Sequence, residues 1–152
     1  MTTLATVITG ASSGIGEALA HLFAPEQQTL VLVARRKERL DALAKELNSK
    51  HGIKVHVIAQ DLQEVGAAAN LMNSIANLNL TVDTLINNAG FGISAPFAKS
   101  DGAKTSAMMQ LHMVALTELT HMAFLAMLER RHGRIMNIAS VAAFQACPNF
   151  AV

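Results

Sequence analysis

The sequence contains no tryptophan and no tyrosine, and Cys147 is the only cysteine among its 152 residues. One cysteine cannot build an intrachain disulfide framework, which fits a reducing cytoplasm, and we expect Cys147 to be a small apolar filler. Charge is also scarce, with 15% charged residues and a formal net charge of +1. That balance gives no electrostatic basis for binding nucleic acid or an anionic membrane. Histidine and cysteine do not cluster at ligand spacing, so no metal site is predicted.

Uninterrupted hydrophobic runs of membrane-spanning length are missing too, although 51% of the residues are hydrophobic. The longest apolar stretch, 108–128, is broken by Gln110, His112, Glu118 and His121, so we expect a buried helix and no membrane span. The first three residues lead directly into a strand-like run, which leaves no room for a signal peptide.

Apolar strand-like runs alternate with amphipathic helical runs along the chain. We predict strands near 4–9, 29–34, 53–58, 82–87 and 134–139, and helices near 14–24, 36–50, 63–77 and 103–131. Several of the strands are almost wholly apolar, as expected for a parallel sheet covered on both faces. Right-handed crossovers then give the strand order 3-2-1-4-5. The prediction is a single α/β domain over 1–152, with a doubly wound parallel sheet.

A glycine-rich turn, Thr9-Gly10-Ala11-Ser12-Ser13-Gly14-Ile15-Gly16, joins the first predicted strand to the first predicted helix. Backbone N–H groups in such a turn can approach a phosphate at the positive end of the helix dipole. Gly10 suits a tight turn, Gly14 leaves space for a pyrophosphate, and Gly16 allows close packing of helix and strand. A P-loop is disfavoured because no Gly-Lys-Ser/Thr follows. The alternative is a Ser/Gly-rich turn without a ligand.

This octad resembles the cofactor turn of the short-chain dehydrogenase/reductase family. The resemblance continues at Asp61-Leu62, at Asn87-Asn88-Ala89-Gly90 and at 133–140, in the family's order and spacing. It implies a Rossmann-type fold and an oxidoreductase that interconverts an alcohol and a carbonyl with a nicotinamide cofactor. It also implies a small-molecule substrate, whose identity the sequence does not give, and a homo-oligomer.

The end of the second predicted strand indicates which cofactor is used. A carboxylate there would hold the ribose hydroxyls of NAD, but the sequence reads Ala34-Arg35-Arg36-Lys37. Cations at a helix start are disfavoured by the dipole, and a bound 2′-phosphate would compensate them. We therefore expect NADP, with NAD as the alternative. The other interpretation is a solvated basic turn, in which Arg35 pairs with Glu38 or Arg39 pairs with Asp41.

The family resemblance assigns the remaining contacts with the cofactor. Residues of the glycine turn would hold the pyrophosphate, Asp61 and Leu62 the adenine, and the Asn-Asn-Ala-Gly segment the ribose. The cofactor-binding candidates are Gly10, Ser12, Ser13, Gly14, Ile15, Gly16, Arg35, Arg36, Asp61, Leu62, Asn88, Ala89 and Gly90. Without the family, Asp61 would be the N-cap of the 63–77 helix, and 87–90 would be only a favourable turn.

The resemblance also assigns catalytic groups, not all of which are present. The family's serine, which hydrogen-bonds the carbonyl oxygen, corresponds to Ser140, although by sequence alone that hydroxyl could equally cap a strand end. The family's asparagine, part of a proton relay, corresponds to His112, which could instead be an ordinary core or helix-face histidine. The family's tyrosine and lysine have no counterpart: the tyrosine would be the first residue after Val152.

The missing tyrosine and lysine allow two interpretations of the chain. The chain is either a piece of a longer NADP-dependent oxidoreductase, lacking the C-terminal part of the family fold and inactive alone, or a short protein that binds a dinucleotide without catalysis. A structural or partner-binding module is a third class, which would have to explain why the phosphate turn and Arg35-Arg36 are intact.

Overall fold

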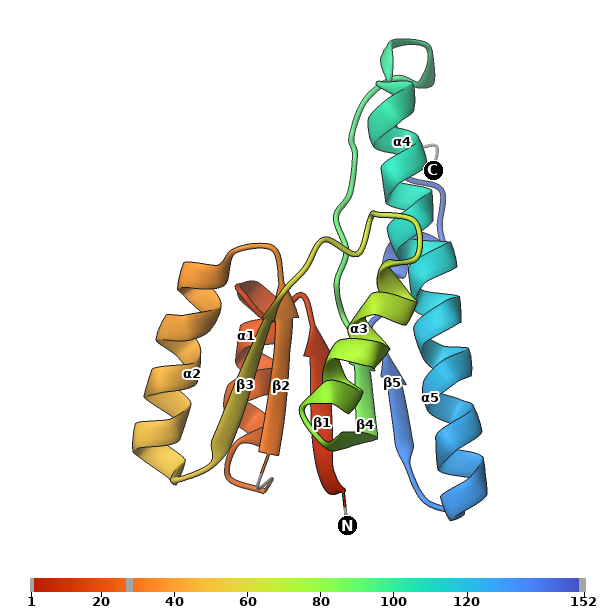
Figure 1. Ribbon diagram of the computed structural model, residues 1–152. Helices are drawn as coiled ribbons and strands as arrows, with labels where there is room; N and C mark the ends of the chain where they lie inside the picture. Colours follow the sequence, from red (N-terminus) through yellow and green to blue (C-terminus); the bar gives the residue numbers. More distant parts are fainter. Residues whose placement is uncertain (1, 27–28, 151–152) are drawn as a thin grey trace.

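The computed structural model describes residues 2–26 and 29–150, which form a five-stranded parallel sheet between two layers of helices (Figure 1). The strand order is β3-β2-β1-β4-β5, which confirms the predicted topology. The strands are β1 (Thr3–Thr9), β2 (Thr29–Ala34), β3 (Lys54–Ala59), β4 (Leu80–Asn87) and β5 (Arg134–Asn137). The carboxyl ends of all five strands therefore lie along one edge of the sheet, where ligands of open α/β sheets bind.

Helices cover both faces, with α1 and α2 on one side of the sheet and α3 and α5 on the other, while α4 projects beyond the strand ends (Figure 1). The helices are α1 (Gly14–Phe23), α2 (Lys37–His51), α3 (Ala67–Asn77), α4 (Gly102–Met109) and α5 (Leu116–Arg130). A π-helical segment (Gln110–Ala115) joins α4 to α5, and short 3₁₀ turns span Phe97–Lys99 and Val141–Ala143.

The start of α3 differs from the prediction of a helix over 63–77. Gly66, with φ 77°, precedes the first helical residue, Ala67. Asp61 is not the N-cap: its Oδ1 accepts a hydrogen bond from the Gln63 N–H at 3.0 Å, which closes a local turn. The left-handed backbone at Gly66, which favours glycine, is where the chain turns into the helix. The segment after β3 is thus a loop beside the strand ends, and Asp61 belongs to it.

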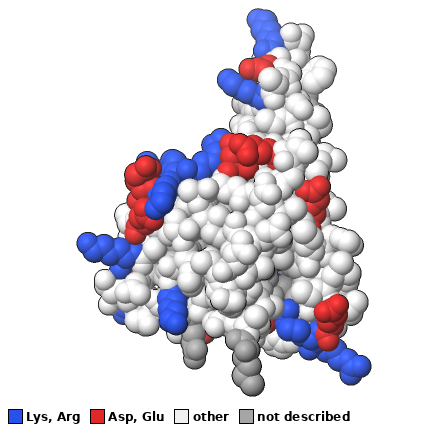
Figure 2. All heavy atoms as spheres, viewed as in Figure 1, with Lys and Arg blue, Asp and Glu red and all other residues white. Residues whose placement is uncertain are grey.

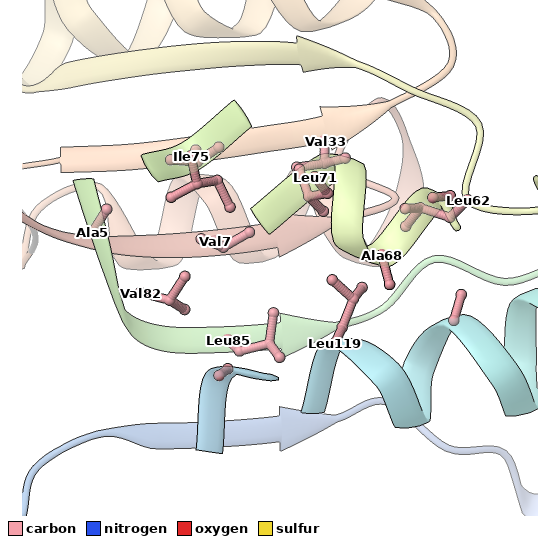
Figure 3. Packing of buried hydrophobic residues seen from close by; sticks show 14 of the residues in the cluster. Ala5, Val7, Val33, Leu62, Ala68, Leu71, Ile75, Val82, Leu85 and Leu119 are labelled. Carbon is pink, nitrogen blue, oxygen red and sulfur yellow. The ribbon is translucent and has the colours of Figure 1, made fainter. Parts of the chain in front are cut away.

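Two apolar clusters hold the layers together because successive strand side chains point to opposite faces. Val31 and Val33 pack with α3 and α5, whereas Leu30 and Leu32 pack with α1 and α2. Figure 3 shows the first cluster, in which Leu119 of α5 lies close to the strands. Most strand residues in the two clusters are buried, so the edge of strand ends lies above a packed core.

The long helical run Gly102–Arg130 is buried along one side only. Residues spaced four apart, from Leu111 through Leu119 to Met127, pack on the sheet, while Met113 and Phe124 are 62% and 51% exposed. By length and composition alone, this run is long and apolar enough to cross a membrane, a property that core helices of soluble proteins share. In its most apolar stretch of 18 residues, 28% is buried. The predicted helix therefore packs on the sheet with its inner face, while its outer face, which Figure 2 shows as mostly uncharged, is exposed.

Candidate nucleotide-binding site

The glycine turn between β1 and α1 has the backbone that its three glycines predict. Gly10 and Gly14 have φ values of 69° and 60°, in the region that favours glycine. A Cβ on Gly16 would lie 2.3 Å from the Gly10 carbonyl oxygen, so any side chain there would force strand and helix apart. A Cβ on Gly14 would meet nothing within 4 Å, which leaves open space at the start of α1.

The start of α1 offers donors to an anion in that space. The N-cap residue, Ser13, makes no capping hydrogen bond with its side chain to any residue that the structure describes. The first N–H groups of a helix have no partner within the helix, and the helix dipole adds positive potential there. Open space above Gly14 together with these donors fits a phosphate group, so the turn is suited to the pyrophosphate of a dinucleotide.

Thr9 fixes the position of the Asn-Asn-Ala-Gly segment beside the glycine turn. Its Oγ1 accepts hydrogen bonds from the backbone N–H groups of Asn88 and Ala89, both at 3.0 Å, and donates to the Ile86 carbonyl at 3.2 Å. The Asn88 amide group donates to the Thr9 carbonyl at 2.9 Å. The two loops are thereby held as one unit. This role of Thr9 was not predicted, because a threonine at a strand end carries no sequence signal for it.

The three cations after β2 have three different surroundings. The Arg35 guanidinium lies 3.7 Å from the Asp61 carboxylate, and the Lys37 ammonium lies 2.7 Å from that of Asp41. Neither pairing matches those expected for a solvated basic turn. In Figure 2 positive and negative groups meet above the upper ends of β2 and β3.

Arg36 reaches back over the glycine turn. Its Nη2 donates to the hydroxyl oxygens of Ser12 at 2.9 Å and Ser13 at 2.7 Å. Within residues 2–26 and 29–150, Arg36 forms no ion pair. It is therefore a cation held in place by neutral hydroxyls, with its charge available to an anion.

A cleft of about 150 Å³ opens at this edge of the sheet. It brings together nine of the predicted cofactor-binding residues with six that were not predicted to bind the cofactor. The predicted ones are Gly10, Ser12, Ser13, Arg35, Arg36, Asp61, Leu62, Ala89 and Gly90, and the others are Val33, Ala34, Gln60, Gln63, Phe91 and Leu111. Four further predicted residues do not line it: Gly14, Ile15 and Gly16 are the first residues of α1, and Asn88 directly follows β4. The sequence pattern thus predicted the loops that border the cleft, but not the apolar lining residues Val33, Ala34, Phe91 and Leu111.

The predicted catalytic residues lie outside this cleft lining. Ser140 is exposed, and its Oγ accepts a hydrogen bond from the Ala142 N–H at 3.2 Å, so the hydroxyl caps a short turn after β5. His112 is exposed on the π-helical segment, with its ring against Phe91 and Gly90. No hydrogen bond joins His112 to Ser140 in the part of the chain that the structure describes. The catalytic roles of both residues stay predictions.

The strand ends beside these residues are braced by amides. The Asn87 side-chain N–H donates to Asn137 Oδ1 and to Thr120 Oγ1, each at 2.9 Å. The Ile138 N–H donates to the Asn87 carbonyl at 2.9 Å. Asn87 thus ties β4 to the segment that carries Ser140 and to helix α5. Cys147 is half-buried, as for a small filler.

Comparison with known proteins gives one consistent result. The family model for short chain dehydrogenase matches residues 5–152. The ketoacyl reductase HetN of Nostoc sp. is 34% identical over 145 residues, which cover 93% of this chain and 50% of HetN.

Solved structures agree. The alcohol dehydrogenase of Comamonas testosteroni described as specific for bulky-bulky ketones matches with a TM-score of 0.88 and 32% identity, over 99% of this chain and 59% of that one. A short-chain dehydrogenase of Sphingobium yanoikuyae in complex with NADPH matches with a TM-score of 0.85 and 36% identity, over 93% and 55%. The chain thus spans about half the length of the curated relative and somewhat more of the two structures.

Proposed function

The chain belongs to the short-chain dehydrogenase family of oxidoreductases, whose members use a nicotinamide dinucleotide, and from this premise we propose that it binds NADP(H) in preference to NAD(H). Arg36 carries the proposal. Of the three cations after β2, it alone among the described residues lacks a carboxylate partner, and it lies against Ser12 and Ser13 at the cleft. A 2′-phosphate would supply the missing negative charge, with Arg36 and both hydroxyls as its donors.

The rest of the cleft supports a dinucleotide in one orientation. The open start of α1 suits the pyrophosphate, and the loop with Asp61 and Leu62 suits the adenine. The backbone of Ala89 and Gly90, fixed through Thr9, suits the ribose. The complex of the Sphingobium relative with NADPH supports the same choice of cofactor.

For chemistry, we propose that the whole protein to which this chain corresponds interconverts an alcohol and a carbonyl. When bound, the cofactor supplies or accepts a hydride. Ser140, which follows β5 at the start of a short turn, would hydrogen-bond the carbonyl oxygen. The sequence contains no tyrosine, so this chain does not itself hold the family's proton donor. That observation favours a second candidate for the 152-residue chain alone, which is dinucleotide binding without turnover.

Calorimetric titration with NADPH and NADH tests the proposal. We expect NADPH to bind at least about tenfold more tightly, because a charge-assisted hydrogen bond contributes about 1.5–3 kcal/mol. Equal dissociation constants for the two cofactors would refute the NADP preference, and absence of binding for both would refute nucleotide binding by this chain.

A further inference from the structure

One ring nitrogen of His112 faces both backbone groups of Phe91. The Phe91 N–H lies 3.1 Å from His112 Nε2, and the Phe91 carbonyl oxygen lies 2.9 Å from the same atom. These two contacts are the only hydrogen bonds of the His112 ring within residues 2–26 and 29–150. A ring nitrogen accepts a hydrogen bond when it carries no proton and donates one when it does. Nε2 can therefore satisfy only one of the two groups at a time.

The surroundings keep the ring at this position. A Cβ on Gly90 would lie 2.6 Å from His112 Cε1, so the ring packs where only a glycine leaves room. The Phe91 ring is tilted against the imidazole at 58°, with 6.2 Å between centroids. His112 itself lies in the π-helical segment Gln110–Ala115, and π-helical turns within long helices are frequent at functional sites.

We propose that His112 is a positioning residue whose protonation selects which backbone group of Phe91 it holds, and thereby sets the position of the loop that begins at Gly90. Without a proton, Nε2 accepts from the Phe91 N–H. With one, Nε2 donates to the Phe91 carbonyl, and the N–H must turn to another partner. Imidazolium always carries a proton on Nε2, so lowering the pH populates the second arrangement.

No other titrating group competes for this contact. The loop residues 88–98 carry no titratable side chain, and residues 138–150 carry only Cys147. Along its own helical run, the nearest charged residues are Lys104 and Glu118, each more than one turn away. A pH-dependent change in the Phe91 backbone would therefore report on His112.

The loop position matters for the site because Gly90 and Phe91 line the cleft. On the proposed function, the second arrangement shifts the backbone that would face the ribose. The affinity for NADPH should then respond to the protonation of His112, by about two- to tenfold, as expected for one hydrogen bond gained or lost.

Nuclear magnetic resonance of the chain without cofactor tests the proposal independently of nucleotide binding. We expect the chemical shifts of the Phe91 amide and of the His112 Cε1–H to change with pH and to share the same midpoint. His112→Asn supplies both a donor and an acceptor without titrating, so the Phe91 amide should become independent of pH. His121→Asn, which changes another exposed histidine of the same helical run, is the matched control and should leave the titration intact. A Phe91 amide that does not shift while His112 titrates, or that still shifts in His112→Asn, would overturn the proposal.

Titration with the cofactor then distinguishes a failure of the proposed role of His112 from a failure of the proposed function. The ratio of NADPH dissociation constants between wild type and His112→Asn should change with pH, while the ratio for His121→Asn stays constant. Using ratios cancels the titration of the 2′-phosphate itself, whose second pKa is about 6. Absence of NADPH binding by the wild type would refute the proposed function, while the resonance titration would still decide the role of His112. If His112→Asn fails to fold, the wild type alone tests the role of His112. Equal midpoints for the Phe91 amide and the His112 Cε1–H would support it, and different midpoints would refute it.

Discussion

Replacing Arg36 by alanine should weaken NADPH binding and leave NADH binding nearly unchanged. Arg36 donates to Ser12 and Ser13 and forms no ion pair among the described residues. Removing it therefore leaves no carboxylate of these residues without its cationic partner. A charge-assisted contact with phosphate contributes about 1.5–3 kcal/mol, which corresponds to about 10- to 150-fold in the dissociation constant. Arg36 is exposed, and solvent and salt screen exposed charges, so we expect about tenfold.

Arg35 should matter less than Arg36. Its guanidinium already lies 3.7 Å from Asp61, and part of its attraction for a phosphate is offset by that carboxylate. Exposed pairs contribute about 0–1 kcal/mol, so Arg35→Ala should cost less than about fivefold in NADPH affinity. The double replacement should remove the preference for NADPH altogether.

Lys37→Ala is the matched control, since Lys37 pairs with Asp41 and does not line the cleft. We expect it to change either affinity by no more than about twofold. Calorimetry with NADPH and NADH on all four variants would measure the effects. Arg36 would not be the residue that binds the 2′-phosphate if Arg36→Ala weakened NADPH binding no more than Lys37→Ala does. The same conclusion would follow if Arg36→Ala weakened NADH binding equally.

Four other predictions use different assays. Gly16→Ala should destabilise the fold by about 2 kcal/mol or more in urea unfolding, because its Cβ would meet the Gly10 carbonyl, whereas Gly102→Ala, with open space around it, should change stability by less than about 1 kcal/mol. Equal effects of the two would contradict the packing. Thr9→Val should cost about 1–3 kcal/mol by leaving the Asn88 and Ala89 N–H groups without an acceptor, and Thr9→Ser should restore most of it; a neutral Thr9→Val would show that water replaces the hydroxyl. The 152-residue chain should reduce simple ketones with NADPH no faster than background, since loss of a general acid alone forfeits about 10²–10⁴ in rate; substrate-dependent NADPH oxidation that survives repurification would refute this. Finally, with Met113, Phe124 and Leu128 exposed and β5 at an open edge, sedimentation at micromolar concentration should show a dimer, larger species or aggregates, and a monodisperse monomer would contradict it.

The topology and the glycine turn could be predicted because both depend on short-range pattern. Nearly all-apolar strands alternating with helices leave few arrangements, and the observed strand order is the predicted one. The positive φ values at Gly10 and Gly14 and the tight contact at Gly16 are properties that glycine alone permits at those positions.

Contacts across the sheet edge could not be predicted in the same way. Arg35 and Arg36 are adjacent in sequence, yet one reaches Asp61 beyond β3 and the other reaches Ser12 before α1. Successive side chains at a strand end point to opposite sides, so a run of basic residues does not say which one remains free. The role of Thr9 and the position of His112 against Phe91 likewise depend on loops that meet only in the folded chain.

The start of α3 was predicted incorrectly, and the sequence did not say which face of the long helix would be buried. Asp61 followed by a helical pattern looks like an N-cap, but Gly66 takes a left-handed conformation and delays the helix to Ala67. An apolar run such as 108–128 does not reveal which of its faces meets the sheet, and here the outer face remains exposed.

A crystal structure of the chain with NADP⁺ would test the central claim most directly. The account predicts the 2′-phosphate within hydrogen-bonding distance of the Arg36 guanidinium and the Ser12 and Ser13 hydroxyls, with the pyrophosphate over Gly14 at the start of α1. A dinucleotide bound elsewhere, or bound in the cleft with its 2′-phosphate directed away from Arg36, would contradict it.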